Sequence, residues 1–419
     1  MGIYKTGVEV TDFGPYVTRL FLDIGQDVGA LDILPGDFEV YVERKNAKTG
    51  GILRTKEPFE RDKDAEPARG IRRVIGVYPC DSEGGYKNPG QWVALEMDTD
   101  GLGKMIEEAR FSKNEYKITY IKSRGFLTEG TVFEESAGMI CPQLDGWGNA
   151  KSLSGSIPLN YGYYTPRLFA DESGKLAPLP LVIWLHGAGE GGVEPTVAYT
   201  GNKAAGLSSK DIQGKLGGQA WVMAPQCPTV WMDDGKEYYG HSNTSIYTAS
   251  LKACIDEFIK KRPGLVDMSR IYLGGCSNGG FMTVRRAIDY PDFFAAIFPV
   301  CEAFFEENLT PEVIKNLKEI PCWLVHARGD ALVDPEITAV PLYKKLLEAG
   351  AKNVHFTYFD SMDDELARFW KVSLPPHAFD HGVWVKVYND QCHTDFDGGQ
   401  VVSEGRPATL FEWLGHQKR

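Results

Sequence analysis

The chain has 419 residues, 43% of them hydrophobic, and a formal net charge of -12 at pH 7. This length exceeds what one hydrophobic core usually organises, so two domains are expected. The acidic charge argues against nucleic acid and anionic membranes as partners, because both attract basic surfaces. The sequence contains no run of 18 apolar residues, and its N-terminus lacks a basic segment followed by an apolar one. We therefore expect a soluble protein without a signal peptide in this chain, cytoplasmic as written or secreted as a mature form.

Eight cysteines are scattered singly along the chain, at positions 80, 141, 227, 254, 276, 301, 322 and 392. None belongs to a C-x2-C pair of the kind that binds zinc or forms a redox couple. Most lie in apolar runs, which favours reduced cysteines inside the core. We expect neither a metal nor another cofactor.

Residues 1–150 are predicted to form an all-β sandwich domain. Short runs there alternate apolar and polar side chains between Gly, Pro and Asp turns. The expected strands are 16–22, 38–42, 71–78, 91–97 and 116–121. Residues 137–165 are rich in Gly, Pro and Ser and are interpreted as a linker.

Residues 151–419 are predicted to form an α/β domain. From Leu179 onward, continuously apolar strands alternate with helical segments, which is typical of a mostly parallel sheet covered by helices on both faces. The expected strands are 181–185, 220–225, 271–274, 294–300, 322–326 and 354–359, and the expected helices are 250–261, 281–288, 337–349 and 408–414.

The strand at Ile271 leads into Gly275-Cys276-Ser277-Asn278-Gly279, which precedes a predicted helix. A G-x-S-x-G motif in this context predicts a nucleophile elbow that exposes Ser277 at the tip of the sheet. The glycines prevent collisions where the strand and the helix cross. Taken alone, the pentapeptide fits a glycine-rich turn with an incidental serine equally well.

A serine nucleophile requires a histidine base and an acid that orients it, here expected in the order Ser, acid, His. Asp330 is favoured as the acid because it directly follows the end of a predicted strand. Asp334 lies on the same loop, and either carboxylate would also serve as a cap for the next helix.

Three histidines at positions 377, 381 and 393 follow Asp330 and are candidates for the base. His381 is favoured because the bulky Trp384 nearby can hold its loop, and His393 is the fallback. His326 and His355 lie within predicted strands and are interpreted as core histidines or structural hydrogen-bond partners. A metal site at 377–381 is disfavoured, because that segment lacks a convincing helix and a further ligand.

An oxyanion on the substrate requires donors that are already in place. The N–H of Asn278 is one expected donor, at the start of the helix after the elbow. The N–H of Ala188 is the other, within the glycine-rich segment His186-Gly187-Ala188-Gly189. That segment lacks G-K-[ST] and G-x-G-x-x-G patterns, so nucleotide binding is not expected.

The motifs at 180–190, 224–228, 270–280 and 410–414 resemble those of the α/β-hydrolase superfamily. More closely, they are similar to bacterial esterases and predicted peptidases related to polyhydroxybutyrate depolymerases. A subgroup of these esterases carries an N-terminal immunoglobulin-like domain, and the segments 14–18, 38–42 and 116–119 look similar to it. In this family the catalytic histidine commonly opens an H-x-x-W pattern, which His381 and Trp384 match.

These patterns lead to the hypothesis of a serine carboxylic-ester hydrolase that works through an acyl-enzyme on short-chain, aryl or carbohydrate esters. A serine peptidase on the same scaffold and an inactive carbohydrate-binding protein are the alternatives. The expected partner is a small-molecule or polymer-borne ester, and a homo-oligomer is compatible with the sequence. Four residues are candidates for the substrate pocket: Trp231, Glu302, Phe304 and Trp384.

Overall fold

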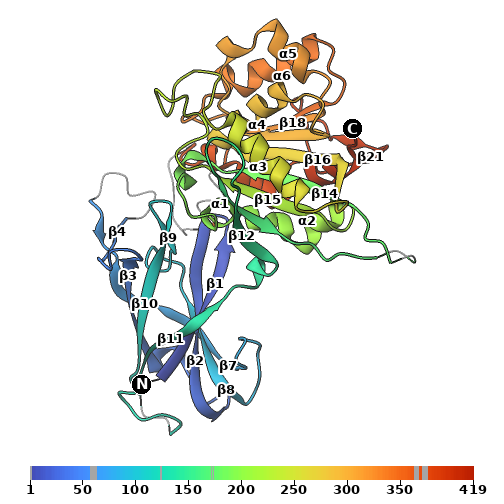
Figure 1. The fold of residues 1–419 in the computed structure, drawn as a ribbon. Helices are drawn as coiled ribbons and strands as arrows, with labels where there is room; N and C mark the ends of the chain where they lie inside the picture. Colours follow the sequence, from blue (N-terminus) through green and yellow to red (C-terminus); the bar gives the residue numbers. More distant parts are fainter. Residues whose placement is uncertain are drawn as a thin grey trace. The chain divides into compact units, whose positions relative to one another are not determined.

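The computed structural model describes residues 2–56, 64–122, 125–170, 172, 174–362, 368–369 and 376–419. The chain divides into two compact units, Met1–Asp145 and Gly146–Arg419 (Figure 1). Each unit has its own sheet and its own buried core. The division falls slightly before the boundary at residue 150 that the sequence predicts.

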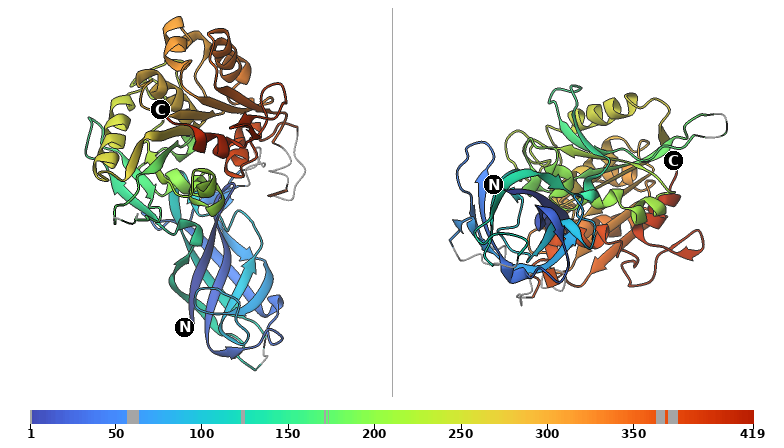
Figure 2. Two further views of the ribbon diagram at one scale, coloured as in Figure 1. Left: turned by 90° about the vertical axis from the view of Figure 1, so that its right-hand side faces the viewer. Right: turned by 90° about the horizontal axis from the view of Figure 1, so that it is seen from below.

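The first unit is all-β, and the part of it that is described holds a nine-stranded sheet. The strand order is β6-β3-β10-β11-β1-β2-β8-β7, with β9 paired to β10, and the views of Figure 2 show these strands wrapping around a common core. Strand β1 is antiparallel to β2 and parallel to β11. The strands are β1 (Gly2–Thr11), β2 (Gly14–Val28), β3 (Phe38–Asn46), β6 (Arg69–Arg72), β7 (Val74–Cys80), β8 (Gly90–Met97), β9 (Ile106–Glu107), β10 (Arg110–Tyr120) and β11 (Val132–Ile140), and a small separate ladder joins β4 (Arg54–Thr55) to β5 (Glu66–Pro67).

The alternation in β3 shows why this segment forms a strand. Phe38, Val40 and Val42 point into the core, whereas Glu39 between them is exposed. Val40 and Val42 pair with Ile118 and Tyr116 of β10, which are buried as well.

The described part of the second unit is built around an eight-stranded sheet in the order β12-β13-β15-β14-β16-β17-β18-β19. The ladders from β15 to β19 are parallel, whereas β12 and β13 add two antiparallel strands at one edge. The strands are β12 (Trp147–Lys151), β13 (Asn160–Tyr164), β14 (Leu179–Leu185), β15 (Trp221–Gln226), β16 (Val266–Cys276), β17 (Ala296–Val300), β18 (Cys322–Ala327) and β19 (Val354–Phe359), and a hairpin of β20 (Val402–Ser403) and β21 (Arg406–Pro407) lies outside this sheet.

Much of the predicted linker at 137–165 instead forms strands. Its first residues end β11, and β12 and β13 supply the antiparallel edge of the second sheet. The glycine at position 162 lies within β13 for a packing reason. A Cβ there would lie 2.2 Å from the ring of Tyr199, so the close contact of the ring with the strand requires glycine.

Helices cover both faces of the second sheet, as the sequence predicts (Figures 1 and 2). On one face α3, α4, α5 and α6 are successive neighbours, and the other face carries α1, α2, α8 and α9. The helices are α1 (Val197–Thr200), α2 (Lys210–Lys215), α3 (Thr248–Lys260), α4 (Asn278–Asp289), α5 (Pro311–Leu317), α6 (Ala339–Glu348), α8 (Trp384–Tyr388) and α9 (Leu410–His416).

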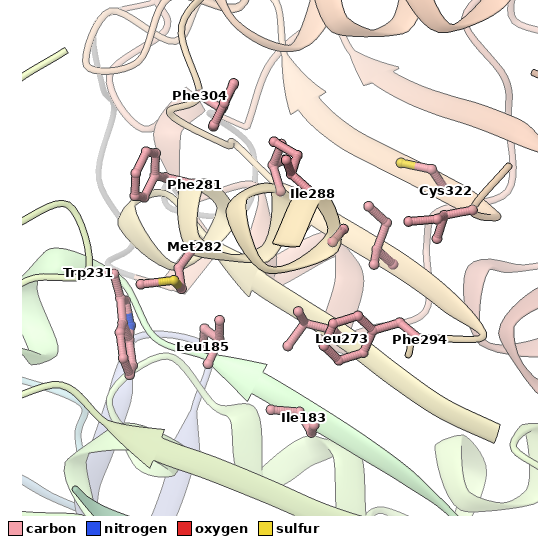
Figure 3. Close-up of a cluster of buried hydrophobic side chains, with 14 of the residues drawn as sticks. Ile183, Leu185, Trp231, Leu273, Phe281, Met282, Ile288, Phe294, Phe304 and Cys322 are labelled. Atoms are coloured by element: carbon pink, nitrogen blue, oxygen red, sulfur yellow. The ribbon is translucent and has the colours of Figure 1, made fainter. Parts of the chain in front are cut away.

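The two faces follow from alternation within the strands. Ile183 and Leu185 belong to the core cluster that also contains Phe281 of α4, as the close-up of Figure 3 shows. Trp184 lies between them in sequence and points to the opposite face, where its ring meets Tyr388 of α8 edge-on at 5.1 Å. Both sides of β14 are therefore apolar, as expected for a central parallel strand.

No helix within the described residues combines the length and the apolar character that crossing a membrane requires.

Candidate active site

The candidate site lies at the carboxyl edge of the second sheet. Because β14, β16, β17 and β18 are parallel neighbours, their carboxyl ends meet at the same edge. The segments that leave this edge begin at His186, Ser277, Cys301 and Arg328. These segments contain most of the residues that the sequence singled out.

Ser277 occupies the turn between β16 and α4 with φ 55 and ψ -118. This left-handed conformation is strained for any residue with a side chain, so the surrounding structure must enforce it. The Ser277 N–H donates to the Val300 carbonyl at 2.8 Å, which ties the turn to β17. This geometry is the strand–turn–helix context that a nucleophile elbow requires.

The glycines around Ser277 allow three chain segments to approach closely. A Cβ on Gly275 would lie 2.6 Å from the Gly279 carbonyl oxygen, and one on Gly279 would lie 2.0 Å from the Leu185 carbonyl oxygen. A Cβ on Gly280 would lie 2.8 Å from the Cα of Glu302. Side chains at these positions would push α4 away from the ends of β14 and β17.

Asp330 is buried in the loop after β18, and both of its carboxylate oxygens are bonded. Its Oδ1 accepts the backbone N–H groups of Leu332 and Val333 at 2.9 and 3.0 Å. Its Oδ2 lies 2.7 Å from His381 Nδ1 and 3.0 Å from His326 Nε2. Burial alone would raise the pKa of this carboxyl, but the hydrogen bonds from His326 and His381 hold the pKa of Asp330 well below its usual range.

His381 lies in the 3-10 turn η7 (Asp380–Gly382), directly before α8. The ring of Trp384 stands almost perpendicular to the imidazole, with the centroids 5.7 Å apart. His393 has an exposed side chain, and its backbone carbonyl accepts the Val401 N–H at 3.0 Å. The structure thus brings Asp330 together with His381, while the described contacts of Asp330 do not include His393.

The turn that carries His381 is anchored by Asp380, a residue whose role the sequence did not indicate. This fully buried carboxylate accepts the backbone N–H groups of Gly329 at 3.1 Å and Met362 at 2.8 Å. The hydroxyl of Ser361 and the Nδ1 of His377 also contact it, at 3.1 and 2.8 Å. Asp380 therefore joins the loop of Asp330 to the turn of His381.

The buried imidazole of His186 fixes the start of the segment after β14 through hydrogen bonds. Its Nε2 accepts the Cys227 N–H at 2.9 Å, so the proton is on Nδ1, which donates to the Gly187 carbonyl at 2.7 Å. Burial lowers the pKa of His186 to about 4, so this imidazole is neutral. Ala188 begins the turn η3 (Ala188–Glu190) and Asn278 begins α4, so neither N–H has a partner within its own helix.

Three of the four predicted pocket residues are fully buried. Trp231 and Phe304 belong to the apolar core around α4 (Figure 3). Glu302 is also buried, and this burial raises its pKa to about 8. Trp384 is partly exposed beside His381. A substrate-binding role for any of them stays a prediction.

Among the described residues, no group of three or more His, Cys, Asp and Glu side chains is arranged to hold a metal ion. His377 and Asp380 are instead hydrogen-bonded to each other, and Asp380 and Asp330 accept backbone N–H groups of the loops around them.

Two protein families match separate parts of the chain. Residues 4–134 match the esterase Ig-like N-terminal domain, and residues 169–369 match the phospholipase/carboxylesterase family. These matches confirm the predicted α/β-hydrolase fold of a carboxylesterase-type family and the predicted immunoglobulin-like domain before it.

Individual proteins resemble the chain to different extents. Poly(3-hydroxyalkanoate) depolymerase C of Paucimonas lemoignei is 31% identical over 136 residues, which cover 30% of this chain and 29% of the relative. The chain thus spans less than a third of that relative's length. The crystal structure of a thermostable esterase aligns over 99% of both chains with a TM-score of 0.72 and 22% identity. This likeness supports the fold of the whole chain.

Proposed function

We propose that this protein, which joins an esterase Ig-like domain to a domain of the phospholipase/carboxylesterase family, hydrolyses carboxylic esters through a serine acyl-enzyme. One observation carries the proposal: a strained serine stands at the same edge of the sheet as a buried Asp330–His381 pair with a separation of 2.7 Å. A serine turn without a function has no need of such a pair.

In the proposed reaction, the Ser277 hydroxyl attacks the ester carbonyl carbon and gives its proton to Nε2 of His381. Asp330 accepts the His381 Nδ1–H, which leaves Nε2 free as the base and stabilises the imidazolium that forms. Within the described residues the Ser277 hydroxyl makes no hydrogen bond, so its bond to Nε2 belongs to the proposal. Catalytic hydrogen bonds of this kind often tighten only when substrate is bound.

The tetrahedral intermediate carries a negative charge on the former carbonyl oxygen. The N–H groups of Ala188 and Asn278 are the proposed donors to this oxyanion, since each begins a helical turn with its N–H free of intrahelical bonds. His381 then protonates the leaving alcohol, and a water molecule activated by the same imidazole hydrolyses the acyl-enzyme. The products are a carboxylic acid and an alcohol.

The substrate is proposed only as a class, a small-molecule or polymer-borne carboxylic ester. The name of the Paucimonas lemoignei relative favours testing poly(3-hydroxyalkanoate) beside soluble aryl esters. A library that varies the acyl chain and the alcohol separately would identify which side of the ester the site recognises.

The proposal is tested with p-nitrophenyl acetate and butyrate. Ser277→Ala and His381→Ala should each lower kcat by roughly 10⁴-fold to 10⁶-fold. His393→Ala is the matched control and should keep wild-type kcat, because that side chain is exposed. Hydrolysis that survives Ser277→Ala would refute the acyl-enzyme, and loss of activity in His393→Ala alone would reassign the base. A panel of fluorogenic peptides run in parallel separates an esterase from a peptidase.

A further inference from the structure

The buried His326 is the feature of the site that the proposed reaction does not yet use. It lies near the end of β18 and is fully buried, on the same face of the strand as Cys322 and Leu324. Those two neighbours belong to the apolar core around α4, in which Figure 3 labels Cys322. A third apolar residue would satisfy this face of the strand, so packing alone does not account for a histidine there.

The contacts of His326 determine its tautomer. Its Nε2 lies 3.0 Å from Asp330 Oδ2 and 3.1 Å from the Val333 carbonyl oxygen. Both of these atoms accept hydrogen bonds, so Nε2 must carry the proton. Its Nδ1 is buried and has no hydrogen-bond partner among the described residues. A protonated ring would leave an N–H donor buried without an acceptor, which favours the neutral Nε2–H form.

Asp330 Oδ2 therefore accepts N–H donors from two imidazoles, His326 from one side and His381 from the other. The remaining oxygen, Oδ1, is held by the N–H groups of Leu332 and Val333. His326 thus fixes the lone pairs of the oxygen that faces His381. Because both imidazoles donate to Oδ2, His326 also competes with His381 for the negative charge of that oxygen.

We propose that His326 is a positioning residue of the hydrolase: its Nε2–H orients Asp330 and limits how strongly that carboxylate stabilises the His381 imidazolium. The inference rests on the triad proposed above. His326 is fully buried, and the hydrogen bonds described for its ring go to Asp330 and the Val333 carbonyl, so we expect its effect to reach the reaction through Asp330. The titratable groups that face Asp330 are His326, His381 and the buried thiol of Cys301.

Two substitutions separate the hydrogen bond from the packing. His326→Met removes the donor but keeps an apolar side chain of similar size, whereas His326→Gln keeps an N–H donor near the position of Nε2. In His326→Met, kcat for p-nitrophenyl butyrate should fall about 10-fold to 100-fold with little change in KM. The acid limb of the kcat/KM profile should move up by about half a pH unit or more, because Asp330 then stabilises the imidazolium more strongly. His326→Gln should recover most of the rate and move the acid limb back.

The control lies on the neighbouring strand. His355 of β19 pairs through Nδ1 with Asp395 Oδ2 at 2.8 Å, a histidine–aspartate pair that makes no contact with Asp330. His355→Met should lower the melting temperature without moving the acid limb. If His326→Met does not fold, His326→Asn replaces it, since asparagine is polar but too short to place its amide at the Nε2 position.

The outcomes distinguish this inference from the proposed function. Activity that survives Ser277→Ala overturns both. An inactive Ser277→Ala variant together with wild-type kcat and an unmoved acid limb in His326→Met overturns only the role of His326. An equal loss of rate in the Met and Gln variants with an unmoved acid limb also overturns it, because packing would then explain the effect.

Discussion

Replacing Glu302 by glutamine removes an ionisable group from the interior of the second unit while keeping its size. This side chain is fully buried beside the start of α4, and its Oε2 accepts the Phe304 N–H at 2.5 Å. Its Oε1 has no hydrogen-bond partner among the described residues. Burial raises the pKa of Glu302 to about 8, so the folded protein holds this carboxyl in its protonated form at neutral pH.

The sign of the effect follows from the two states. The unfolded chain loses this proton near pH 4.3, as glutamate ordinarily does, whereas the folded chain keeps it up to a pH of about 8. Between these values the unfolded state binds fewer protons, so the free energy of unfolding falls as the pH rises. The slope is at most about 1.4 kcal/mol per pH unit, and the accumulated loss at pH 7 is roughly 3 kcal/mol. Glutamine does not ionise, so the free energy of unfolding of Glu302→Gln lacks this fall with pH.

Thermal unfolding of the wild type and Glu302→Gln between pH 5 and 8.5 measures the difference. The variant should melt close to the wild type at pH 5 and above it at higher pH, with the gap growing by roughly 3–5 °C per pH unit. Glu348→Gln, at the exposed end of α6, is the control and should show a constant difference. A gap for Glu302→Gln that does not change with pH would refute the reasoning, because the folded protein would then not retain the extra proton.

Two further substitutions test how the site is assembled. Gly279→Ala would place a Cβ 2.0 Å from the Leu185 carbonyl oxygen, so it should cost about 3 kcal/mol or more of stability in urea unfolding and lower kcat. Gly214→Ala in α2 has no atom within 4 Å of its new Cβ and should instead stabilise by about 0.5–1 kcal/mol, so equal effects of the two would contradict this account. Asp380→Asn should lower kcat about 100-fold by releasing the turn that carries His381, while Ser361→Ala, which removes only one donor to Asp380, should stay within several-fold of the wild type. Wild-type kcat in Asp380→Asn would show that the turn holds its position without this anchor.

The parts of the site that the sequence predicted are those written into single segments. Ser277 is recognisable because a strand, a glycine-flanked serine and a helix follow one another along the chain. Asp330 is recognisable because it directly follows β18. The continuously apolar run of β14 predicts a strand of a parallel sheet, whereas the alternation in β3 predicts a strand of an all-β domain. Each of these signals lies within one segment of the chain, so it can be recognised without knowing which other segments pack against that segment.

The parts that the sequence missed depend on segments far apart meeting in space. Asp380 lies 51 residues from Gly329, to which it is hydrogen-bonded, and the contact was not predicted from the sequence. Burial is a second property of this kind: Glu302 is a candidate for the substrate pocket, and the sequence does not indicate that its side chain is fully buried beside α4. Gly148 was interpreted as part of a linker, but it lies within β12, where a Cβ would come 3.1 Å from the ring of Tyr163.

Gly329 shows that one such contact leaves a trace in the sequence. A Cβ on this residue would lie 2.2 Å from His377 Nδ1 and 2.5 Å from Asp380 Oδ2. Only glycine at this position therefore allows Asp380 to approach and hold the turn of His381. The next residue, Asp330, bonds His381 on the same turn. Gly329 and Asp330 thus hold the η7 turn through two carboxylates: the Gly329 N–H donates to Asp380 of the turn, and Asp330 accepts from His381 of the turn. A side chain at position 329 would clash with His377 and Asp380 and so displace the turn of His381. Gly329 is therefore as much a requirement for the Asp330–His381 contact as Asp330 itself.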